Sequence, residues 1–375
     1  MKPEAKAKRV VLAYTGSFET CVGIAWLREH SAAEVVTVTL DLGQGRVLEE
    51  VRDRALAAGA VRAHVLDVRE EFAANFIVRA LKADALYEDR YPMATSLGRA
   101  LVAQKLVEVA GIEQASAVAH GGVAADNDQI RIESSVRALN PDLQVLAPVQ
   151  QWGMSAAESR AYARAHGISV PIMESPYSVD ANLWGRAVQY GVLDDPWAEA
   201  PEEVYTLTKS PRDCPDEPAY VEISFESGVP VAINGVEMPV LDLIGSLSII
   251  AGAHGVGRID MVENRLAGTK VREIYEAPAA VLLHTAHKEL QKMVVTTGVD
   301  RFSRAVSLQY ADTIYNGLWF APLREALDAF INKVQERVTG VIRMKLFKGD
   351  CRVVGRKSPF ALYESAPTHA VGSIS

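Results

Sequence analysis

The sequence predicts an α/β fold, a doubly wound parallel sheet followed by an α+β domain, and two observations lead to it. Short aliphatic runs alternate with helical patterns early in the chain, which is typical of parallel βαβ units. From residue 220 onward, alternating apolar and polar residues indicate antiparallel strands. The 375 residues also exceed what one core usually supports. We therefore expect domains over residues 1–171 and 172–357, and a tail over 358–375.

The elements of the first domain follow in order. Strands are expected at residues 10–13, 35–40, 64–66, 117–119 and 143–146, with helices after the first strand and near residues 48–58, 72–81 and 101–109. Ser155 and Glu158 form a capping box that opens another helix. Ligands of such sheets bind beyond the carboxyl ends of the strands. The loops that start at Thr15, Asp41 and His120 should therefore converge on one site.

The second half of the chain has a different pattern. Prolines punctuate residues 196–218, which predicts an irregular connector or arm, and the runs 220–226 and 231–234 predict antiparallel strands. After Pro322, apolar residues recur at helical spacing and predict a helix over about 322–340. Its apolar face fits either packing within the chain or an exchange of helices between subunits.

The amino-acid composition limits the kinds of protein and partner that the sequence is compatible with. Hydrophobic residues make up 49% and charged residues 23%, as in ordinary globular proteins. The net charge of -8 gives no basic footprint for nucleic acid or an anionic membrane, so small molecules are the expected partners. Three cysteines lie far apart, and no stretch resembles a secretion signal or a membrane span. These features favour a protein of the reducing cytoplasm without a zinc site or a disulfide framework.

The turn from Tyr14 to Cys21 is the first candidate site. It follows a buried strand, contains glycine and hydroxyl side chains, and opens a helix. Free backbone N–H groups at such a turn, together with the positive helix end, can hold a phosphate group. No lysine follows as in a P-loop, and there is no GxGxxG. The turn therefore fits a nucleotide site or an ordinary strand-to-helix connection.

A second candidate is the polar run over residues 127–133. On a helix, Asp128 shares a face with Arg131, and Gln129 shares a face with Glu133. A carboxylate, an amide and a guanidinium at a helix start suit an amino-acid-like ligand that carries both charges. A solvated helix face is the alternative.

Two further runs are rich in polar residues. Residues 87–96 offer hydroxyl groups ahead of a helix that Ser96 could cap. Residues 254–265 have the polar density of a loop that leads to a site, where Glu263 could take a substrate ammonium group. For this second run, the alternative is a surface ion-pair network.

Together these motifs resemble the argininosuccinate synthase family from residue 10 to about residue 363. The turn after the first strand, the runs 87–91 and 127–131, and the complete run 254–265 carry the resemblance. It implies an N-type ATP pyrophosphatase domain, of the adenine nucleotide alpha hydrolase-like kind, then a synthetase domain and a C-terminal oligomerisation helix in a homotetramer. It also implies an ATP-binding ligase of amino-acid (arginine) biosynthesis that forms a carbon–nitrogen bond. MgATP adenylates citrulline and releases pyrophosphate, and an amine then displaces AMP.

The resemblance also implies roles for individual residues. The positions that would bind ATP are Ala13, Tyr14, Thr15, Gly16, Ser17, Glu19, Thr20, Cys21, Leu40 and Gly121. The positions that would bind the citrulline-like substrate are Tyr91, Ser96, Arg131, Ser178, Glu263 and Tyr275, and those for the amine substrate are Val123, Asn127 and Asp128. Thr15, Asn127, Asp128 and Arg131 would be catalytic, and no resident metal is implied.

The chain departs from the family pattern at the site itself. In the turn, Ser17 replaces a glycine expected to need positive φ, while Glu19 replaces aspartate and Cys21 replaces serine. Between residues 122 and 127, Val123 replaces the threonine expected to bind the aspartate carboxylate, Ala125 replaces a lysine, and Asp126 adds negative charge. Ala187 replaces a serine expected to assist citrulline binding.

These departures leave three hypotheses open. The first is a ligase that joins a citrulline-like substrate to an amine other than aspartate in a specialised biosynthetic pathway, with weakened ATP binding. The second is a genuine argininosuccinate synthase that tolerates the changes. The third is a catalytically silent homologue that binds a nucleotide.

Overall fold

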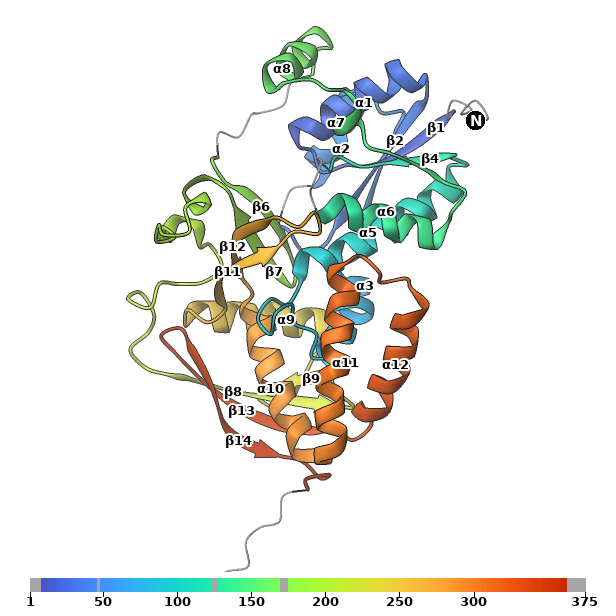
Figure 1. Ribbon diagram of the computed structural model, residues 1–375. Helices are drawn as coiled ribbons and strands as arrows, with labels where there is room; N and C mark the ends of the chain where they lie inside the picture. Colours follow the sequence, from blue (N-terminus) through green and yellow to red (C-terminus); the bar gives the residue numbers. More distant parts are fainter. Residues whose placement is uncertain (1–7, 46–47, 123–126, 169–174, 363–375) are drawn as a thin grey trace, which may run out of the picture.

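The computed structural model describes residues 8–45, 48–122, 127–168 and 175–362. A parallel sheet lies at one end of the molecule and an antiparallel sheet at the other, with a smaller sheet and a layer of helices between them (Figure 1). The boundary expected at residue 171 lies outside the described residues.

The N-terminal sheet confirms the doubly wound fold. Its strand order is β3-β2-β1-β4-β5, and every neighbouring pair is parallel. The strands are β1 (Arg9–Ala13), β2 (Glu34–Asp41), β3 (Arg62–Asp67), β4 (Ala117–Ala119) and β5 (Gln144–Leu146). The helices between and after them are α1 (Phe18–Ser31), α2 (Leu48–Ala57), α3 (Arg69–Phe72), the π-helical turn η1 (Ala73–Ile77), α4 (Val78–Lys82), α5 (Ala94–Ile112), α6 (Asn127–Leu139), α7 (Pro148–Gln151) and α8 (Ala156–Ala165).

The first strand shows why the sheet is covered on both faces. Side chains alternate across a strand, so a strand that is apolar at every position must be buried on both sides. Val10 and Leu12 pack in a cluster with Ile24 of α1, whereas Val11 packs in the other cluster, which contains Leu97 of α5. The expected capping box is also present, because Ser155 and Glu158 each bond the backbone of the other at the start of α8.

The second half contains two antiparallel sheets, which confirms the α+β expectation. The smaller sheet has the order β11-β12-β7-β6, from β6 (Ser178–Asn182), β7 (Gly185–Gln189), β11 (Arg258–Asn264) and β12 (Lys270–Glu276). The larger has the order β10-β9-β8-β13-β14, from β8 (Ala219–Glu226), β9 (Val229–Ile233), β10 (Val236–Glu237), β13 (Gly340–Phe347) and β14 (Asp350–Lys357). The proline-rich stretch between β7 and β8 holds only the short helices η2 (Gly191–Asp194) and η3 (Glu202–Val204) among otherwise irregular chain.

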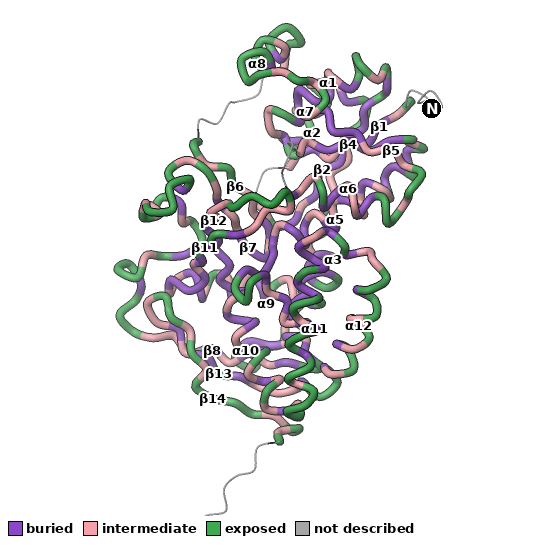
Figure 2. Tube along the Cα trace, in the orientation of Figure 1, coloured by how far each residue is buried: buried purple, intermediate pink, exposed green. Residues whose placement is uncertain are grey.

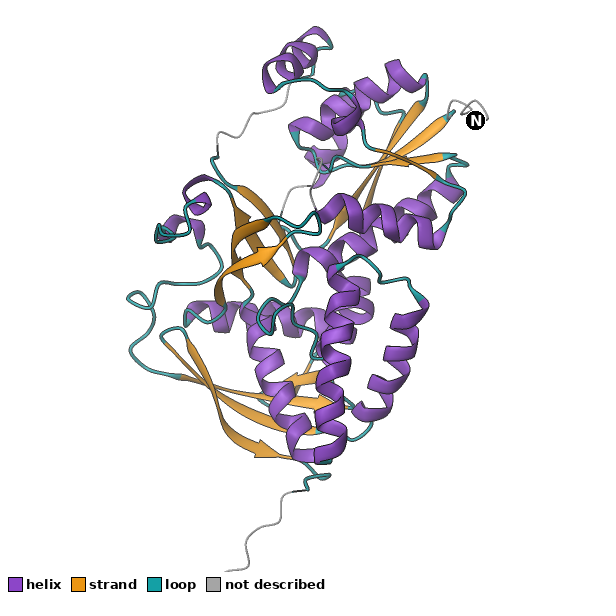
Figure 3. Ribbon diagram, in the orientation of Figure 1, coloured by secondary structure: helices purple, strands orange, loops and turns teal. Residues whose placement is uncertain are grey.

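Helices α9 (Val240–Ala253) and α10 (Pro278–Val294) pack against the larger sheet (Figure 3). Helix α11 (Thr297–Tyr315) packs on α10, and α12 (Pro322–Gln335) packs on α11 and α4. The last helix ends at Gln335, earlier than the expected end near residue 340. Val338 lies beyond it, in the turn to β13. Ile331 of α12 packs within the chain, while Leu323 is exposed. The exchange of helices between subunits stays a prediction.

Burial follows these layers (Figure 2), with α10 largely buried and the outer strand β14 largely exposed. None of the helices in the described ranges has the length and apolar character that crossing a membrane requires.

Two local expectations were wrong. The run 254–265 is not mainly a loop, because residues 258–264 form β11, whose buried and more exposed side chains alternate as in a half-buried strand. Ser96 does not cap α5, because the helix begins two residues earlier, after Met93.

Candidate active site

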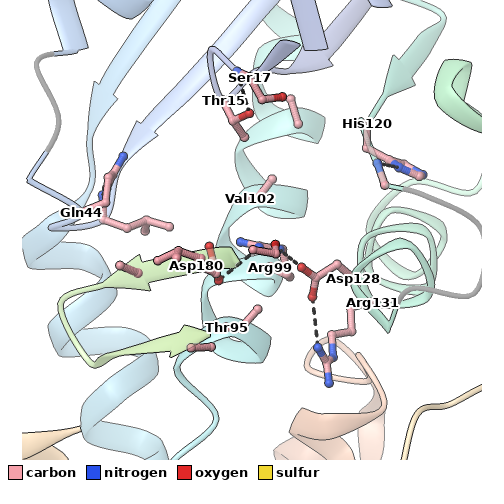
Figure 4. A pocket seen from close by; sticks show the side chains of 18 of the residues that line it. Thr15, Ser17, Gln44, Thr95, Arg99, Val102, His120, Asp128, Arg131 and Asp180 are labelled. Carbon is pink, nitrogen blue, oxygen red and sulfur yellow. Dashed lines mark hydrogen bonds and ion pairs between the residues drawn. The ribbon is translucent and has the colours of Figure 1, made fainter. Parts of the chain in front are cut away.

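A cavity of about 840 Å³ lies between the carboxyl edge of the parallel sheet and the smaller antiparallel sheet. The loops after β1, β2 and β4 converge on it, as expected from the carboxyl-end rule. Helices α5 and α6 form a second part of its wall, and strands β6, β7, β11 and β12 form much of the remainder. Figure 4 shows the cavity from close by. Segments far apart in the sequence therefore contribute to one space.

At the nucleotide end, the turn of residues 14–20, here called the phosphate loop, leads into α1. Gly16 has a φ of 74°, and Ser17 is the N-cap of α1 with φ -71° and ψ 164°. The Ser17 hydroxyl accepts a hydrogen bond from the backbone N–H of Thr20 at 3.3 Å. The expectation that Ser17 occupies a position of positive φ was therefore wrong: the neighbouring glycine takes that conformation, and serine is a favoured cap. The departure at residue 17 does not strain the loop.

Cys21 lies in the core rather than at the cavity. Its side chain is fully buried, its sulfur lies 2.9 Å from the hydroxyl of Tyr14, and burial raises the pKa of the thiol. The backbone N–H of Cys21 donates to Ser17 O at 3.0 Å, so neither its side chain nor its N–H faces a ligand. The expectation that Cys21 contacts ATP is therefore wrong.

The loop after β4 closes the other side of the nucleotide end. Gly121 packs so near Thr20 that an added Cβ would lie 2.8 Å from Thr20 Cγ2. The N–H of Gly122 donates to Nδ1 of His120 at 3.1 Å, so this ring carries its proton on Nε2 when neutral. Burial lowers the pKa of His120, although Glu133 opposes that shift. The residues between Gly122 and Asn127 are outside the described part of the chain, and the candidate Val123 lies there with Ala125 and Asp126.

A row of alternating charges occupies the centre of the cavity (Figure 4). Arg99 Nη2 lies 3.1 Å from Asp180 and Arg99 Nε lies 2.7 Å from Asp128, which in turn lies 3.0 Å from Arg131 Nη1. Burial alone would raise the pKa of Asp128, but the guanidinium groups of Arg99 and Arg131 hold it below its usual value. The pair Asp128 and Arg131 confirms the shared helix face, as does the 2.8 Å hydrogen bond from Gln129 to Glu133.

The amino-acid end is built from tyrosines around a buried carboxylate. The rings of Tyr91 and Tyr275 stack at 3.7 Å, and those of Tyr87 and Tyr315 stack at 3.8 Å. The Tyr275 hydroxyl donates to Glu263 Oε2 at 2.7 Å. Glu263 is 3% exposed, and burial raises its pKa. A carboxylate buried among hydroxyl groups is suited to pair with a positively charged ligand group.

Asn127 and Arg131 connect this end to helix α6. Asn127 donates to the hydroxyl of Tyr315 at 3.1 Å and accepts from the N–H of Leu266 at 2.7 Å. Arg131 donates from Nε to the carbonyl of Tyr315 at 2.9 Å, and its guanidinium lies 4.8 Å from the centre of that ring. Both side chains are buried, so their positions are set before a ligand enters.

The structure brings most of the expected site residues to the cavity. Those that line it are Ala13, Tyr14, Thr15, Ser17, Glu19, Thr20, Leu40, Tyr91, Gly121, Asn127, Asp128, Arg131, Ser178, Glu263 and Tyr275. Gly16, Cys21 and Ser96 do not line it; Ser96 is buried, and its hydroxyl has no partner in the described structure. The departure Ala187 does line it.

Sequence reasoning gave no role to several polar residues that line the cavity, among them Thr95, Arg99, Asp180 and Glu273. Periodicity could have found two of them. Arg99 follows Thr95 by four residues on one helix face, and Glu273 precedes Tyr275 by two residues on one strand face. Only the three-dimensional fold shows that Asp180 faces Arg99.

Within the described ranges, no three His, Cys, Asp or Glu side chains cluster in a way that could hold a metal ion.

The fold and the cavity define a class: a protein in which a doubly wound parallel domain and an α+β domain share one cavity lined by charged side chains. Two family models match the chain, "Arginosuccinate synthase N-terminal HUP domain" over residues 9–169 and "Arginosuccinate synthase C-terminal domain" over residues 177–370. The chain belongs to the argininosuccinate synthase family. Members of that family form carbon–nitrogen bonds with release of AMP, and this chain is a ligase of that type.

Curated relatives support the same family. The argininosuccinate synthase of Symbiobacterium thermophilum is 53% identical over 358 residues, which cover 95% of this chain and 89% of that protein. Those of Geobacillus thermodenitrificans and Gloeobacter violaceus are 51% and 52% identical, and the alignments cover 95% and 96% of this chain and 88% and 91% of those proteins. A solved NAD+ synthetase from Burkholderia pseudomallei covers 44% of this chain and 69% of its own at 23% identity, with a TM-score of 0.29, too weak a likeness to bear on the fold.

Proposed function

We propose that the chain is an argininosuccinate synthase, which joins citrulline to aspartate at the expense of MgATP in cytoplasmic arginine biosynthesis. One observation carries the proposal: a single cavity holds a capped helix start at one end and the Glu263 and Tyr275 pair at the other. The first end suits a polyphosphate, and the second suits the ammonium group of an amino acid. The shared name of the curated relatives supports the choice of substrates.

The first chemical step would take place where the two ends meet. The ureido oxygen of citrulline attacks the α-phosphorus of ATP, an oxygen–phosphorus bond forms, and the bond to pyrophosphate breaks. The hydroxyl groups of Thr15, Ser17 and Thr20 and the free N–H groups at the start of α1 would hold the triphosphate. Magnesium bound to ATP adds charge neutralisation to these contacts.

The second step would replace AMP by the amine of aspartate. The amine nitrogen attacks the ureido carbon, a carbon–nitrogen bond forms, the bond to AMP breaks, and a proton leaves the nitrogen. Asn127, Asp128 and Arg131 lie on one helix beside the amino-acid end, so they would orient both amino acids. Because these side chains are already bonded, their main contribution is positioning.

A second candidate is a ligase of the same type that uses another amine. Val123, Ala125 and Asp126 favour it, because they replace a hydroxyl and a cation and add a negative charge near the expected aspartate carboxylate. The conformation of the phosphate loop does not support the hypothesis of weakened ATP binding, because Ser17 acts as a normal helix cap. We therefore rank aspartate first.

The test is an assay of the purified chain with MgATP, citrulline and a panel of amines, with AMP, pyrophosphate and the joined product measured separately. We expect argininosuccinate and AMP in equal amounts, with aspartate the best amine. AMP formation that is faster with another amine would establish the second candidate. Failure to form AMP with any amine would favour a silent homologue. Mass measurement of the intact particle separately tests the predicted homotetramer.

A further inference from the structure

Two carboxylates, those of Glu263 and Glu273, face the amino-acid end of the cavity, and only Glu263 has a role in the proposed function. Strands β11 and β12 are antiparallel, with Met261 opposite Glu273 and Glu263 opposite Val271, which makes the two glutamates diagonal neighbours. Both line the cavity, as does Tyr275, which is two residues from Glu273 on the same strand. The second carboxylate therefore borders the space that a substrate ammonium group would occupy.

The hydrogen bond of Tyr275 shows which of the two glutamates is better suited to carry a negative charge. A tyrosine hydroxyl carries one proton, and that of Tyr275 is donated to Glu263 at 2.7 Å. Donation of this kind stabilises an ionised carboxylate, so it favours the negative charge on Glu263. A proton held by the pair is therefore expected on Glu273.

Little positive charge is left to stabilise a second carboxylate. Across the described chain, neither Glu263 nor Glu273 has a lysine, arginine or histidine nitrogen within 4.0 Å. From α6, Arg131 opposes the negative charge, but it is already paired with Asp128, whose own charge also faces Glu273. From the segment before α5, Tyr91 adds a ring and no charge.

The burial of Glu273 and the charges around it favour its protonated form. Burial raises the pKa of Glu273 to about 8, the charge of Glu263 adds to this rise, and Tyr275 and Arg131 oppose it. On β7, the residue paired with Glu273 is Gln189, a neutral side chain that accepts a hydrogen bond from Arg265. The empty amino-acid end therefore holds one negative charge, on Glu263, and one proton, on Glu273, at neutral pH.

We propose that Glu273 is the second carboxylate of the subsite for the substrate's α-ammonium group, and that it releases its proton to solvent when that group binds. This inference rests on the proposed function and names a further specificity residue of the same site. Before binding, the pair carries one negative charge. Afterwards two carboxylates and one ammonium group also sum to one negative charge, so the net charge of the subsite does not change. A ligand without an amino group cannot drive this exchange.

Calorimetry tests the exchange directly. Citrulline is titrated into the full chain with magnesium and a non-cleavable ATP analogue, at pH 7 in two buffers of different ionisation enthalpy. We expect release of about one proton per citrulline bound, and a Kd that falls about tenfold per pH unit between pH 6 and pH 8. The probe 5-ureidopentanoate, which is citrulline without its amino group, should bind more weakly and release no proton.

Matched variants separate binding from structure. Glu273→Gln should bind citrulline without proton release and with a Kd that is nearly independent of pH, whereas Glu273→Asp should restore the release. Glu222→Gln on the exposed face, where Glu222 pairs with Arg343, should match the wild-type protein. If the Gln variant fails to fold, the wild-type pH profile and the Asp variant carry the test.

The outcomes distinguish this inference from the proposed function. Citrulline binding without proton release by the wild-type protein would overturn the inference and leave the proposed function intact. Unchanged proton release by Glu273→Gln would also overturn it. Absence of both citrulline binding and AMP formation would overturn both proposals.

Discussion

The two ends of the cavity are built in different ways. The nucleotide end is formed largely by one continuous stretch, in which a glycine at positive φ and a capped helix start supply backbone donors. The amino-acid end is formed by side chains from distant segments, including Tyr91, Asn127, Glu263 and Tyr315. The first end depends on backbone shape, and the second depends on buried charges and their partners.

This difference explains which departures from the family sequence are expected to leave ligand binding intact. At the nucleotide end, Ser17 and Cys21 differ from the pattern, yet one caps the helix and the other lies in the core. Neither change strains the backbone of the turn, although the Ser17 cap occupies the N–H of Thr20. At the amino-acid end, a buried carboxylate or amide has a specific partner, and its loss leaves that partner unpaired. We therefore expect mutations there to have larger effects on binding.

The largest effect is expected for Glu263→Gln. The amide keeps the size of the side chain but removes the negative charge that would pair with the substrate ammonium group. A hydrogen bond to a charged group contributes about 2–3 kcal/mol, so citrulline affinity should fall roughly 30- to 150-fold. Affinity for the ATP analogue should stay within about twofold. Calorimetry with each ligand checks both values, and a loss of both affinities would contradict the separation of the two ends.

The next largest effect is expected for Gly16→Ala. A left-handed conformation costs a residue with a Cβ about 1–2 kcal/mol, and the new Cβ would lie 3.2 Å from Val51 Cγ1. Because nucleotide binding needs this turn, ATP affinity should fall roughly 5- to 30-fold, with little change for citrulline. Gly153→Ala is the control, since Gly153 also has positive φ, at 61°, but nothing lies within 4 Å of its added Cβ. The control should lose stability and keep ATP affinity.

The difference between the two ends also determines how much of the site can be predicted from the sequence. The parallel sheet, the turn at residues 14–20 and the helix at residue 127 follow from periodicity and capping, which are local properties. The strand β11 was mistaken for a loop because Asp260 and Asn264 on its more exposed face and Glu263 on its buried face are all polar, and its glycine-rich approach resembles a turn. The contacts of Arg99 with Asp180, and of Tyr275 with Glu263, depend on strand order and register, which no local pattern specifies.

A smaller effect on both ends is expected for Asp180→Asn. Arg99 lies between Asp180 and Asp128 in the middle of the cavity, so it borders the space shared by both substrates. The pair is partly exposed, with side-chain exposures of 21% and 34%, and such pairs contribute about 1 kcal/mol or less. The KM values for ATP and citrulline should rise together, by about two- to fivefold.

The control for this variant is Asp350→Asn, which removes an exposed pair with Arg352 on β14, a strand that contributes no residue to the cavity. It should leave both KM values unchanged. A rise in only one KM for Asp180→Asn would mean that Arg99 belongs to that end alone.

The smallest effect on binding is expected at Cys21, although it directly follows the phosphate loop in the sequence. Cys21→Ser restores the family residue, and its hydroxyl can keep the contact with Tyr14, so ATP affinity should stay within about twofold of wild type. Cys21→Ala removes that contact and leaves the buried Tyr14 hydroxyl without it, which should lower the free energy of unfolding by about 1–3 kcal/mol. Chemical denaturation measures the loss, and calorimetry measures ATP binding. A tenfold gain in ATP affinity for Cys21→Ser would place the thiol among the groups that limit nucleotide binding and would contradict its position in the core.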